Sequence, residues 1–527
     1  MENPGMKYFN SSTITHRKLC AAAIALLALA IGIFCYRERA ISSKAVSSIL
    51  SGYNEQSSYA HITVDYPLND TVFPPEIPAP TFRWINLDTG SDRWLLSFEF
   101  EDKLGRMNFQ TKSTELTLTA KNWESIKERS SGKTATVHIF GVNHSALTII
   151  RGHTKIIFET SKDKVGAPLF YREVKPPFQE AARDLSRIRW RFDSISSLSP
   201  RIVLSNPPFC GSCHSFSRDG KCLVMDMDYA GNKGSYVTAQ VKEQTVITAD
   251  EVNTWDDYDK KSNKYTNGFL ARVSPDGRYV VSMVKDLFVI AYSSFGDFFF
   301  PVRGILAVYD RKNKTYFPLP GADDPEYVQC NPCWSPDGKT IVFIRAKAAE
   351  DKYDTESYSM SSEESLDYLE TIDGFCYDLY RVPFNDGAGG IAEPLKGASN
   401  NGMSNFFPRY SPDGNWIVYC QAKSFIMVRP DSKLHIIPAG GGESRKMKCN
   451  NQGMNSWHSW SPNSRWLVFS SKRNSPFTQL FLTHIDHKGR SSPPVILSNM
   501  TAPDWAANVP EFVNTDPNAI KNIITRF

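Results

Sequence analysis

This chain has no excess of charge of one sign and few cysteines, and each shortage excludes a class of protein. It carries 60 Lys and Arg against 56 Asp and Glu over 527 residues, which argues against a nucleic-acid-binding protein because such proteins need a basic surface. Ten cysteines are too few for a disulfide-rich scaffold. Gly and Pro, at 31 and 32, have an average share, which excludes collagen-like and low-complexity chains.

The sequence also lacks the short motifs of several enzyme classes. It contains no Gly-x-Ser-x-Gly elbow, no phosphate-binding P-loop, no His-Glu-x-x-His zinc motif and no kinase signature. We therefore assign no catalytic residue and no metal site, and we expect a protein that is not an enzyme. Since 41% of the residues are hydrophobic, the chain has enough apolar side chains for folded cores.

The one long apolar run covers residues 19–36 and contains no charged side chain. Its length is near the lower limit of the about 17–25 residues that a membrane-spanning helix needs. A cleaved signal peptide is the alternative, but the best small-residue cleavage site lies inside the run. Basic residues flank both ends, so the positive-inside rule does not choose an orientation. We expect a single-pass anchor, with residues 1–18 as a cytoplasmic tail and the body extracytoplasmic, in the periplasm.

Two further segments precede the main body of the chain. Residues 37–60 are polar and rich in serine, which predicts a linker. Residues 61–175 contain short runs of alternating apolar and polar residues, such as 94–100 and 136–140, which predict β-strands. About 100 residues of short strands with turns between them predict a β-sandwich of the immunoglobulin or fibronectin type III kind.

A repeated signature marks the rest of the chain. It occurs five times, and a β-type run follows each copy: Ser217-Arg218-Asp219-Gly220, Ser274-Pro275-Asp276-Gly277, Ser335-Pro336-Asp337-Gly338, Ser411-Pro412-Asp413-Gly414 and Ser461-Pro462-Asn463-Ser464. Pro, Asp and Gly favour a tight turn between two strands. A spacing of about 60 residues with four strands per unit favours a β-propeller, whose units must stack to bury their faces.

The signature resembles the WD40-like repeat of TolB-like six-bladed β-propellers, and the resemblance covers residues 176–527. It implies an all-β fold in which a sixth blade, without a signature, combines residues 188–192 and 201–204 with C-terminal strands. TolB-like propellers serve as binding platforms. The resemblance therefore implies a non-enzymatic binding or scaffold module of the cell envelope, whose propeller face engages an envelope protein or a surface ligand.

The sharpest local motif is Cys210-Gly211-Ser212-Cys213-His214. Cys-x-x-Cys-His is the attachment sequence of c-type haem, in which both thiols bind the haem and the histidine ligates the iron. Against haem, the motif runs directly into a predicted blade strand, whereas c-type cytochromes place it on a helix. A disulfide and a metal site remain open as alternatives, since each also uses paired cysteines.

A second pair, Cys330 and Cys333, precedes the third signature and is a candidate disulfide or redox pair. A zinc site that joins it to Cys210 and Cys213 is disfavoured, because the two pairs belong to blades that are not sequence neighbours.

Two histidines share one register in the repeat. His214 and His458 each lie three residues before a signature serine, so their side chains are expected to point similarly. His458 is therefore a candidate distal haem ligand or channel acid or base, with Met454 as a fallback axial ligand; the alternative is that both histidines only form structural hydrogen bonds. The sequence thus predicts a membrane-anchored binding propeller, with a c-type haem protein for electron transfer or redox sensing as the alternative.

Overall fold

The computed structural model describes residues 41–87, 90–261, 266–292, 297–349, 358–360, 375–424 and 429–527, and most of them lie in β-strands or their turns. The predicted tail, 1–18, and the predicted anchor, 19–36, lie outside the described residues. None of the helices in the described part is long and apolar enough to cross a membrane.

The chain forms two compact units. The first, called the N-terminal unit, contains the described residues up to Pro67 with Thr81–Leu118 and Thr134–Ile157. The second, called the propeller unit, contains Leu68–Pro80, Thr119–Lys133 and Phe158–Phe527. It includes helix α3 (Ala120–Arg129).

Two β-sheets build the N-terminal unit. The larger sheet has the order β1 (Ala60–His61), β9 (Gly152–Thr160), β8 (Thr134–Val142), β5 (Arg93–Phe100) and β6 (Met107–Thr111). The smaller one has the order β2 (Thr63–Tyr66), β4 (Thr81–Ile85) and β7 (Glu115–Thr117). The long central strands β5 and β8 pair antiparallel over eight positions, from Arg93 opposite Val142 to Phe100 opposite Ala135.

The segment expected to be a linker, 37–60, instead contains helix α2 (Ser43–Gly52). Ile41, Ala45 and Ile49 recur every four residues and are buried in one cluster with Leu95, Phe140 and Val142. Three of the serines that suggested a tether, Ser42, Ser43 and Ser47, occupy exposed positions between them. Ser42 caps the first turn by accepting a hydrogen bond from Ala45 N at 3.2 Å. An apolar stripe of helical period outweighs a polar composition, because burial of that stripe stabilises the helix.

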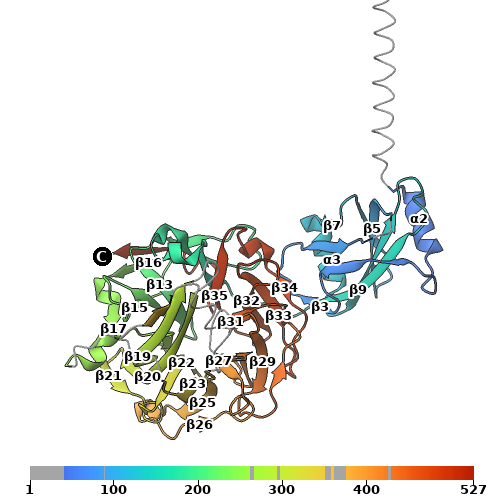
Figure 1. Ribbon diagram of the computed structural model, residues 1–527. Helices are drawn as coiled ribbons and strands as arrows, with labels where there is room; N and C mark the ends of the chain where they lie inside the picture. Colours follow the sequence, from blue (N-terminus) through green and yellow to red (C-terminus); the bar gives the residue numbers. More distant parts are fainter. Residues whose placement is uncertain are drawn as a thin grey trace, which may run out of the picture. The chain divides into compact units, whose positions relative to one another are not determined.

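Within the described residues, the propeller unit contains six blades of four strands each (Figure 1). The second and third blades are joined into one sheet by the pairing of Gly304 with Val328. The first blade contains β13 (Cys210–Phe216), β14 (Cys222–Asp228), β15 (Ser235–Gln240) and β17 (Val252–Thr254). The second contains β18 (Arg272–Val273), β19 (Tyr279–Tyr292), β20 (Asp297–Asp310) and β21 (Thr315–Pro318). The third contains β22 (Tyr327–Trp334), β23 (Thr340–Lys347), β25 (Asp378–Pro383) and β26 (Glu393–Pro394).

The remaining blades complete a ring. The fourth contains β27 (Ser404–Tyr410), β28 (Trp416–Ala422), β29 (Lys433–Pro438) and β30 (Arg445–Lys446). The fifth contains β31 (Asn455–Trp460), β32 (Trp466–Ser471), β33 (Gln479–His484) and β34 (Val495–Ile496). The sixth contains β35 (Ala506–Phe512), β10 (Leu169–Val174), β11 (Ile188–Asp193) and β12 (Ile202–Ser205). The all-β propeller part of the predicted fold is thus confirmed.

The ring closes by pairing the two ends of the propeller sequence. Strand β35 near the C-terminus pairs antiparallel with β10, from Leu169 opposite Phe512 to Val174 opposite Ala506. A second contact of the same kind joins β16 (Gln244–Thr248) in parallel to β36 (Asn522–Arg526). The composite sixth blade expected from residues 188–192 and 201–204 is present, and its strand β10 begins before residue 176. Closure removes exposed sheet edges, which are otherwise sites of aggregation.

The repeated signature has the same hydrogen bonds in all five copies. The serine hydroxyl donates to the side-chain oxygen of the Asp or Asn two residues later, at 2.5–2.7 Å. The same hydroxyl accepts from the main-chain N–H five residues later, at 2.9–3.0 Å. The turn is therefore closed by the serine side chain, which explains why the sequence repeats Ser and Asp rather than apolar residues.

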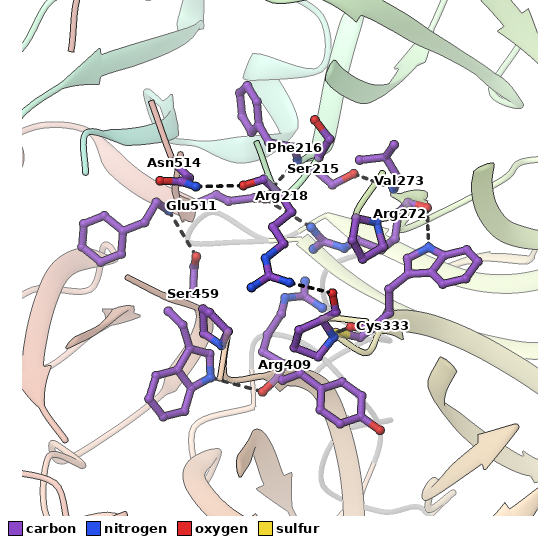
Figure 2. Close-up of a pocket in the computed structure, with 18 of the residues that line it drawn as sticks. Ser215, Phe216, Arg218, Arg272, Val273, Cys333, Arg409, Ser459, Glu511 and Asn514 are labelled. Carbon is purple, nitrogen blue, oxygen red and sulfur yellow. Dashed lines mark hydrogen bonds and ion pairs between the residues drawn. The ribbon is translucent and has the colours of Figure 1, made fainter. Parts of the chain in front are cut away.

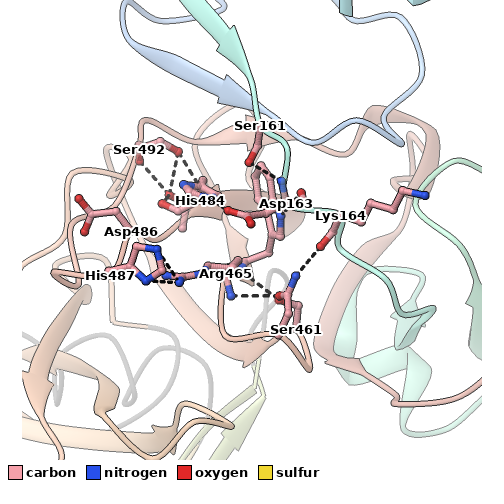
Figure 3. A network of polar contacts seen from close by, with 12 residues as sticks. Ser161, Asp163, Lys164, Ser461, Arg465, His484, Asp486, His487 and Ser492 are labelled. Atoms are coloured by element: carbon pink, nitrogen blue, oxygen red, sulfur yellow. Dashed lines mark hydrogen bonds and ion pairs between the residues drawn. The ribbon is translucent and has the colours of Figure 1, made fainter. Parts of the chain in front are cut away.

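A short loop after β9 is fastened to the fifth blade (Figure 3). The imidazole Nε2 of His484 lies 2.8 Å from Asp163 Oδ2, and the Trp466 indole donates to the Asp163 carbonyl at 2.9 Å. The fifth signature carries Asn463 in place of Asp, and this amide donates to the Lys164 carbonyl at 2.6 Å. The one departure from the Asp pattern thus has a structural reason, because a carboxylate could not donate this hydrogen bond.

Candidate functional site

The six innermost strands surround a channel, and each is linked to the next by a hydrogen bond from or to a side chain. These strands contact one another in cyclic order: β13, β18, β22, β27, β31 and β35. Going around the ring, the links are Val273 N to Ser215 Oγ, Trp334 Nε1 to Arg272 O, Phe407 N to Asn331 Oδ1, Trp460 Nε1 to Arg409 O, Phe512 N to Ser459 Oγ and Phe216 N to Glu511 Oε1. The closed circle fixes the positions of the side chains that line the channel.

A cavity of about 290 Å³ opens at the end of the channel where the inner strands run into the signature turns; we call it the turn cavity (Figure 2). Each inner strand contributes one residue at the same level of the ring: Ser215, Arg272, Cys333, Arg409, Ser459 and Glu511. Its charged lining residues are three arginines, at positions 218, 272 and 409, and the single carboxylate of Glu511. The cavity is therefore electropositive.

Arg272 and Glu511 form the fixed ion pair of this cavity. Arg272 Nη1 donates to Glu511 Oε2 at 3.2 Å and to the His214 carbonyl at 2.9 Å. Burial raises the pKa of Glu511, although the Arg272 charge and the hydrogen bond from Phe216 N act in the opposite direction. The pair ties the sixth blade to the first two, and it uses the only acidic side chain among the described residues that line the cavity.

Arg218 and Arg409 are the remaining cations, and Figure 2 shows their side chains turned toward the middle of the turn cavity. Arg218 donates to the Pro336 carbonyl at 3.2 Å, and Arg409 donates to the Pro408 carbonyl at 2.9 Å. Within the described part of the chain, neither guanidinium pairs with a carboxylate. Two uncompensated guanidinium groups facing one cavity make a site for an anion, since their planar donors match carboxylate geometry.

A second cavity of about 190 Å³, called the opposite cavity, lies at the other end of the inner strands. Cys210 and Cys213 line it, but His214 does not. A β-bulge between Gly211 and His214 changes the alternation of side chains along β13. The His214 ring is fully buried against Phe170, with ring centroids 4.7 Å apart.

The environment of the motif does not fit a covalent haem. Burial lowers the pKa of His214 to about 3, with a further contribution from the charge of Arg272. Among the described residues, neither ring nitrogen has a hydrogen-bond partner of good geometry. Burial also raises the pKa of the Cys213 thiol to about 12. An iron ligand must point a nitrogen into open volume beside both thiols, whereas this imidazole lies inside the packed interior. We therefore derive no step through haem.

His458 and Met454 are structural in their contacts. His458 is buried, its Nε2 lies 3.0 Å from the Val418 carbonyl, and its Nδ1 lies 3.9 Å from Cys420 Sγ. Burial lowers the pKa of His458 to about 4. Neither His458 nor Met454 lines the turn cavity or the opposite cavity. His458 therefore lies outside both cavities, and its hydrogen bond to the fourth blade corresponds to the structural alternative left open in the sequence.

The second cysteine pair, Cys330 and Cys333, lies on strand β22, and its two side chains have different environments. Cys330 is fully buried and burial raises the pKa of its thiol, while Cys333 lines the turn cavity with a pKa raised by burial to about 11. Both cysteines are free thiols in the structure. The bulge at Asn331 separates them along β22. High thiol pKa values disfavour thiolate chemistry at either position.

The arginines of the turn cavity were missed in the sequence, although a signal for them exists. Arg272 and Arg409 lie two residues before a signature serine, and Arg218 lies one residue after one. His214 and His458 lie three residues before a signature serine, whereas five residues that line the turn cavity lie two residues before one. Glu511 carries no such signal, because the sixth blade has no signature.

No family model and no curated protein matches this chain. Among solved structures, TolB from Acinetobacter baumannii is 13% identical with a TM-score of 0.39, over 72% of this chain and 79% of that one. A putative TolB from Agrobacterium tumefaciens is 14% identical with a TM-score of 0.35, over 66% and 98%. The periplasmic gluconolactonase of Pseudomonas aeruginosa is 14% identical with a TM-score of 0.34, over 63% and 84%. The similar structures thus include both TolB proteins and an enzyme, and these similarities do not indicate whether this chain binds a partner or catalyses a reaction.

Proposed function

We propose that this protein is a non-enzymatic binding module, held at a membrane by residues 19–36, whose propeller binds an acidic segment of a partner protein. The turn cavity receives that segment, and the Arg218 and Arg409 guanidinium groups bind its carboxylates. The body lies on the extracytoplasmic side, in the periplasm, where the partner is an envelope protein.

One observation carries this proposal. Two arginines face the same cavity without a carboxylate partner in the described part of the chain, while the only acidic residue there is used by Arg272. Uncompensated like charges repel each other in the free protein, and an anionic ligand relieves that repulsion. Each charge-assisted hydrogen bond of this kind stabilises a complex by about 1.5–3 kcal/mol.

The chemistry of the cavity favours binding over catalysis. Its one thiol, Cys333, has a pKa raised to about 11 and is therefore protonated at neutral pH. The hydroxyls of Ser215 and Ser459 accept hydrogen bonds from main-chain N–H groups at 3.1 Å. Activation of a nucleophile needs an adjacent base, and none of the described residues that line this cavity is a histidine.

The proposal is tested by fluorescence anisotropy of a labelled hexaglutamate peptide added to the full-length protein, with hexaglutamine as the neutral comparison. We expect the acidic peptide alone to bind, and the affinity to fall as salt is raised. Arg409→Gln and Arg218→Gln are each expected to weaken binding about tenfold.

Arg490→Gln is the matched control, because Arg490 is exposed on the fifth blade and pairs with Asp486 at 2.6 Å, away from the turn cavity. It is expected to leave binding unchanged. Equal binding of both peptides, or equal loss in all three variants, would overturn the proposal.

A further inference from the structure

The opposite cavity holds an unusual number of buried polar groups without partners. Asp226 and Asn508 are only 5% and 2% exposed, yet Asp226 Oδ1 and Asn508 Nδ2 have no hydrogen-bond partner in the described part of the chain. Both residues line this cavity. A buried polar atom without a partner costs about 1–3 kcal/mol, and a ligand that supplies the missing partner would remove that cost.

The unpartnered atoms divide into acceptors and donors. On the acceptor side, Asp226 Oδ2 accepts a hydrogen bond from Ala271 N at 3.2 Å, which leaves Oδ1 without a partner, and Asp228 Oδ1 is likewise buried without a partner in the described part of the chain. On the donor side are Asn508 Nδ2, Arg172 Nε and the indole Nε1 of Trp457. Asn508 is oriented by Thr478, whose hydroxyl donates to its Oδ1 at 2.6 Å, so that the amide nitrogen is the group left over.

The rest of the wall is apolar and largely aromatic. The side chains there are Phe178, Met227, Phe269, Phe288, Trp457 and Val509. The cations Arg172 and Lys233 lie among the acids Asp226 and Asp228, and burial raises the pKa of Asp226 to about 7. Since the wall is close to neutral overall, the cavity favours a neutral ligand over an ion. At about 190 Å³ it is smaller than the about 300–1,000 Å³ of sites for drug-sized molecules.

These features together specify the ligand's chemistry. The ligand must be small and neutral, must both donate and accept hydrogen bonds at several points, and must have an apolar face that packs against aromatic rings. A pyranose ring has these properties, since its hydroxyls donate and accept and its C–H faces are apolar. A purely apolar ligand would leave the five polar atoms unsatisfied, and an ion would unbalance the charges.

We propose that the opposite cavity is a carbohydrate-binding site that takes one neutral sugar ring, with Asp226 and Asp228 accepting from its hydroxyls and Asn508, Arg172 and Trp457 donating to them. The site lies at the other end of the channel from the turn cavity, and it stands independently of the acidic partner proposed above.

The test measures binding of four sugars to the full-length protein by saturation-transfer NMR and by tryptophan fluorescence, in which the contribution of Trp457 is taken from the difference between the wild type and Trp457→Phe. The probes are the methyl glycosides of glucose, galactose, mannose and N-acetylglucosamine, and the protein is kept in a detergent without a sugar headgroup. We expect saturable binding of at least one of them with a Kd in the millimolar range or tighter. Tetrahydropyran, which has the ring without hydroxyls, is expected not to bind.

Asp226→Asn is the sharpest variant, because it keeps the side chain's shape while turning an acceptor into a donor. It is expected to weaken sugar binding at least tenfold. Asp378→Asn is its matched control: burial also raises the pKa of that carboxyl, and it accepts from Asn400 N at 2.8 Å, but it lies outside both cavities. Trp457→Phe removes a hydrogen-bond donor with little change in packing. Its control is Trp84→Phe, which removes another buried indole N–H without a partner among the described residues, in the N-terminal unit.

The outcomes separate the two sites. Loss of sugar binding in Asp226→Asn and Trp457→Phe, with both controls unchanged, supports the carbohydrate site. Absence of binding by all four glycosides, or binding that survives both variants, overturns it. Arg409→Gln is expected to leave sugar binding intact while weakening the acidic peptide, so failure of one proposal is distinguishable from failure of the other.

Discussion

The serine of the repeated signature offers a direct test of how the blades are stabilised, and Ser274 in the second blade is the position of choice. Its side chain is 2% exposed and lies outside the lining of both cavities. The hydroxyl donates to Asp276 Oδ1 at 2.5 Å and accepts from Tyr279 N at 2.9 Å. Ser274→Ala removes both bonds with little change in volume.

The expected cost follows from these two bonds. The Tyr279 N–H becomes a buried donor without a partner, which costs about 1–3 kcal/mol. The bond to Asp276 contributes about 0.5–1.5 kcal/mol, since water can take its place at the partly exposed carboxylate. We therefore expect Ser274→Ala to lower the free energy of unfolding by about 2–4 kcal/mol.

Asp276→Asn is the matched control for this prediction. Asn463 occupies the equivalent position in the fifth signature and accepts from Ser461 Oγ at 2.6 Å, so an amide oxygen supports the same turn. Asp276→Asn is expected to change the free energy of unfolding by less than about 0.5 kcal/mol.

The assay is urea unfolding of the full-length protein followed by tryptophan fluorescence, combined with hydrogen exchange of residues 272–282 as a local measurement. Faster exchange at Tyr279 in Ser274→Ala alone is expected. A Ser274→Ala protein as stable as the wild type, or an equal loss in Asp276→Asn, would refute the view that the serine closes the turn.

Three further predictions concern other parts of the chain. Burial, with a smaller contribution from His138, lowers the pKa of His153 to about 4. The N-terminal unit is therefore stabilised above the unfolded pKa of about 6.5, and this stabilisation is lost as the pH falls toward 4. His153→Gln should reduce the loss of unfolding free energy between pH 7 and pH 4.5, measured by denaturant unfolding at both values. Ile523 of β36 is 4% exposed and packs in the core of the closing blades, so Ile523→Ala should cost about 2–5 kcal/mol. The loss should be smaller for Ile524→Ala in the same thermal melt, because Ile524 is only partly buried. Leu26→Arg in the predicted anchor should release the protein from the carbonate-washed membrane fraction, whereas Leu26→Ile should retain it; equal retention would refute anchoring by residues 19–36.

The sequence predicted the propeller well because its signal is local. The signature is a turn closed by one serine within six residues, so the same letters recur wherever the same turn forms. The composite sixth blade could be predicted from the residues left over when five signatures were assigned. Helix α2 was missed because composition was weighed above the four-residue spacing of Ile41, Ala45 and Ile49.

The candidate site was less predictable, and the Cys210-Cys213-His214 motif shows why. The spacing predicts haem attachment, but the bulge in β13 places His214 inside the packed interior while both cysteines face a cavity. Spacing along the chain does not determine the direction of a side chain where the strand is irregular.

By itself, then, the sequence determined the turns, the strands between them and the propeller that they build, since these depend on interactions over a few residues. Only the tertiary structure decided which side chains meet at the channel. Arg218, Arg272, Arg409 and Glu511 come from four different blades, and Asp226 meets Asn508 only because β35 closes the ring against β10. The binding chemistry of the channel is a product of that closure, because no short segment of the chain contains it.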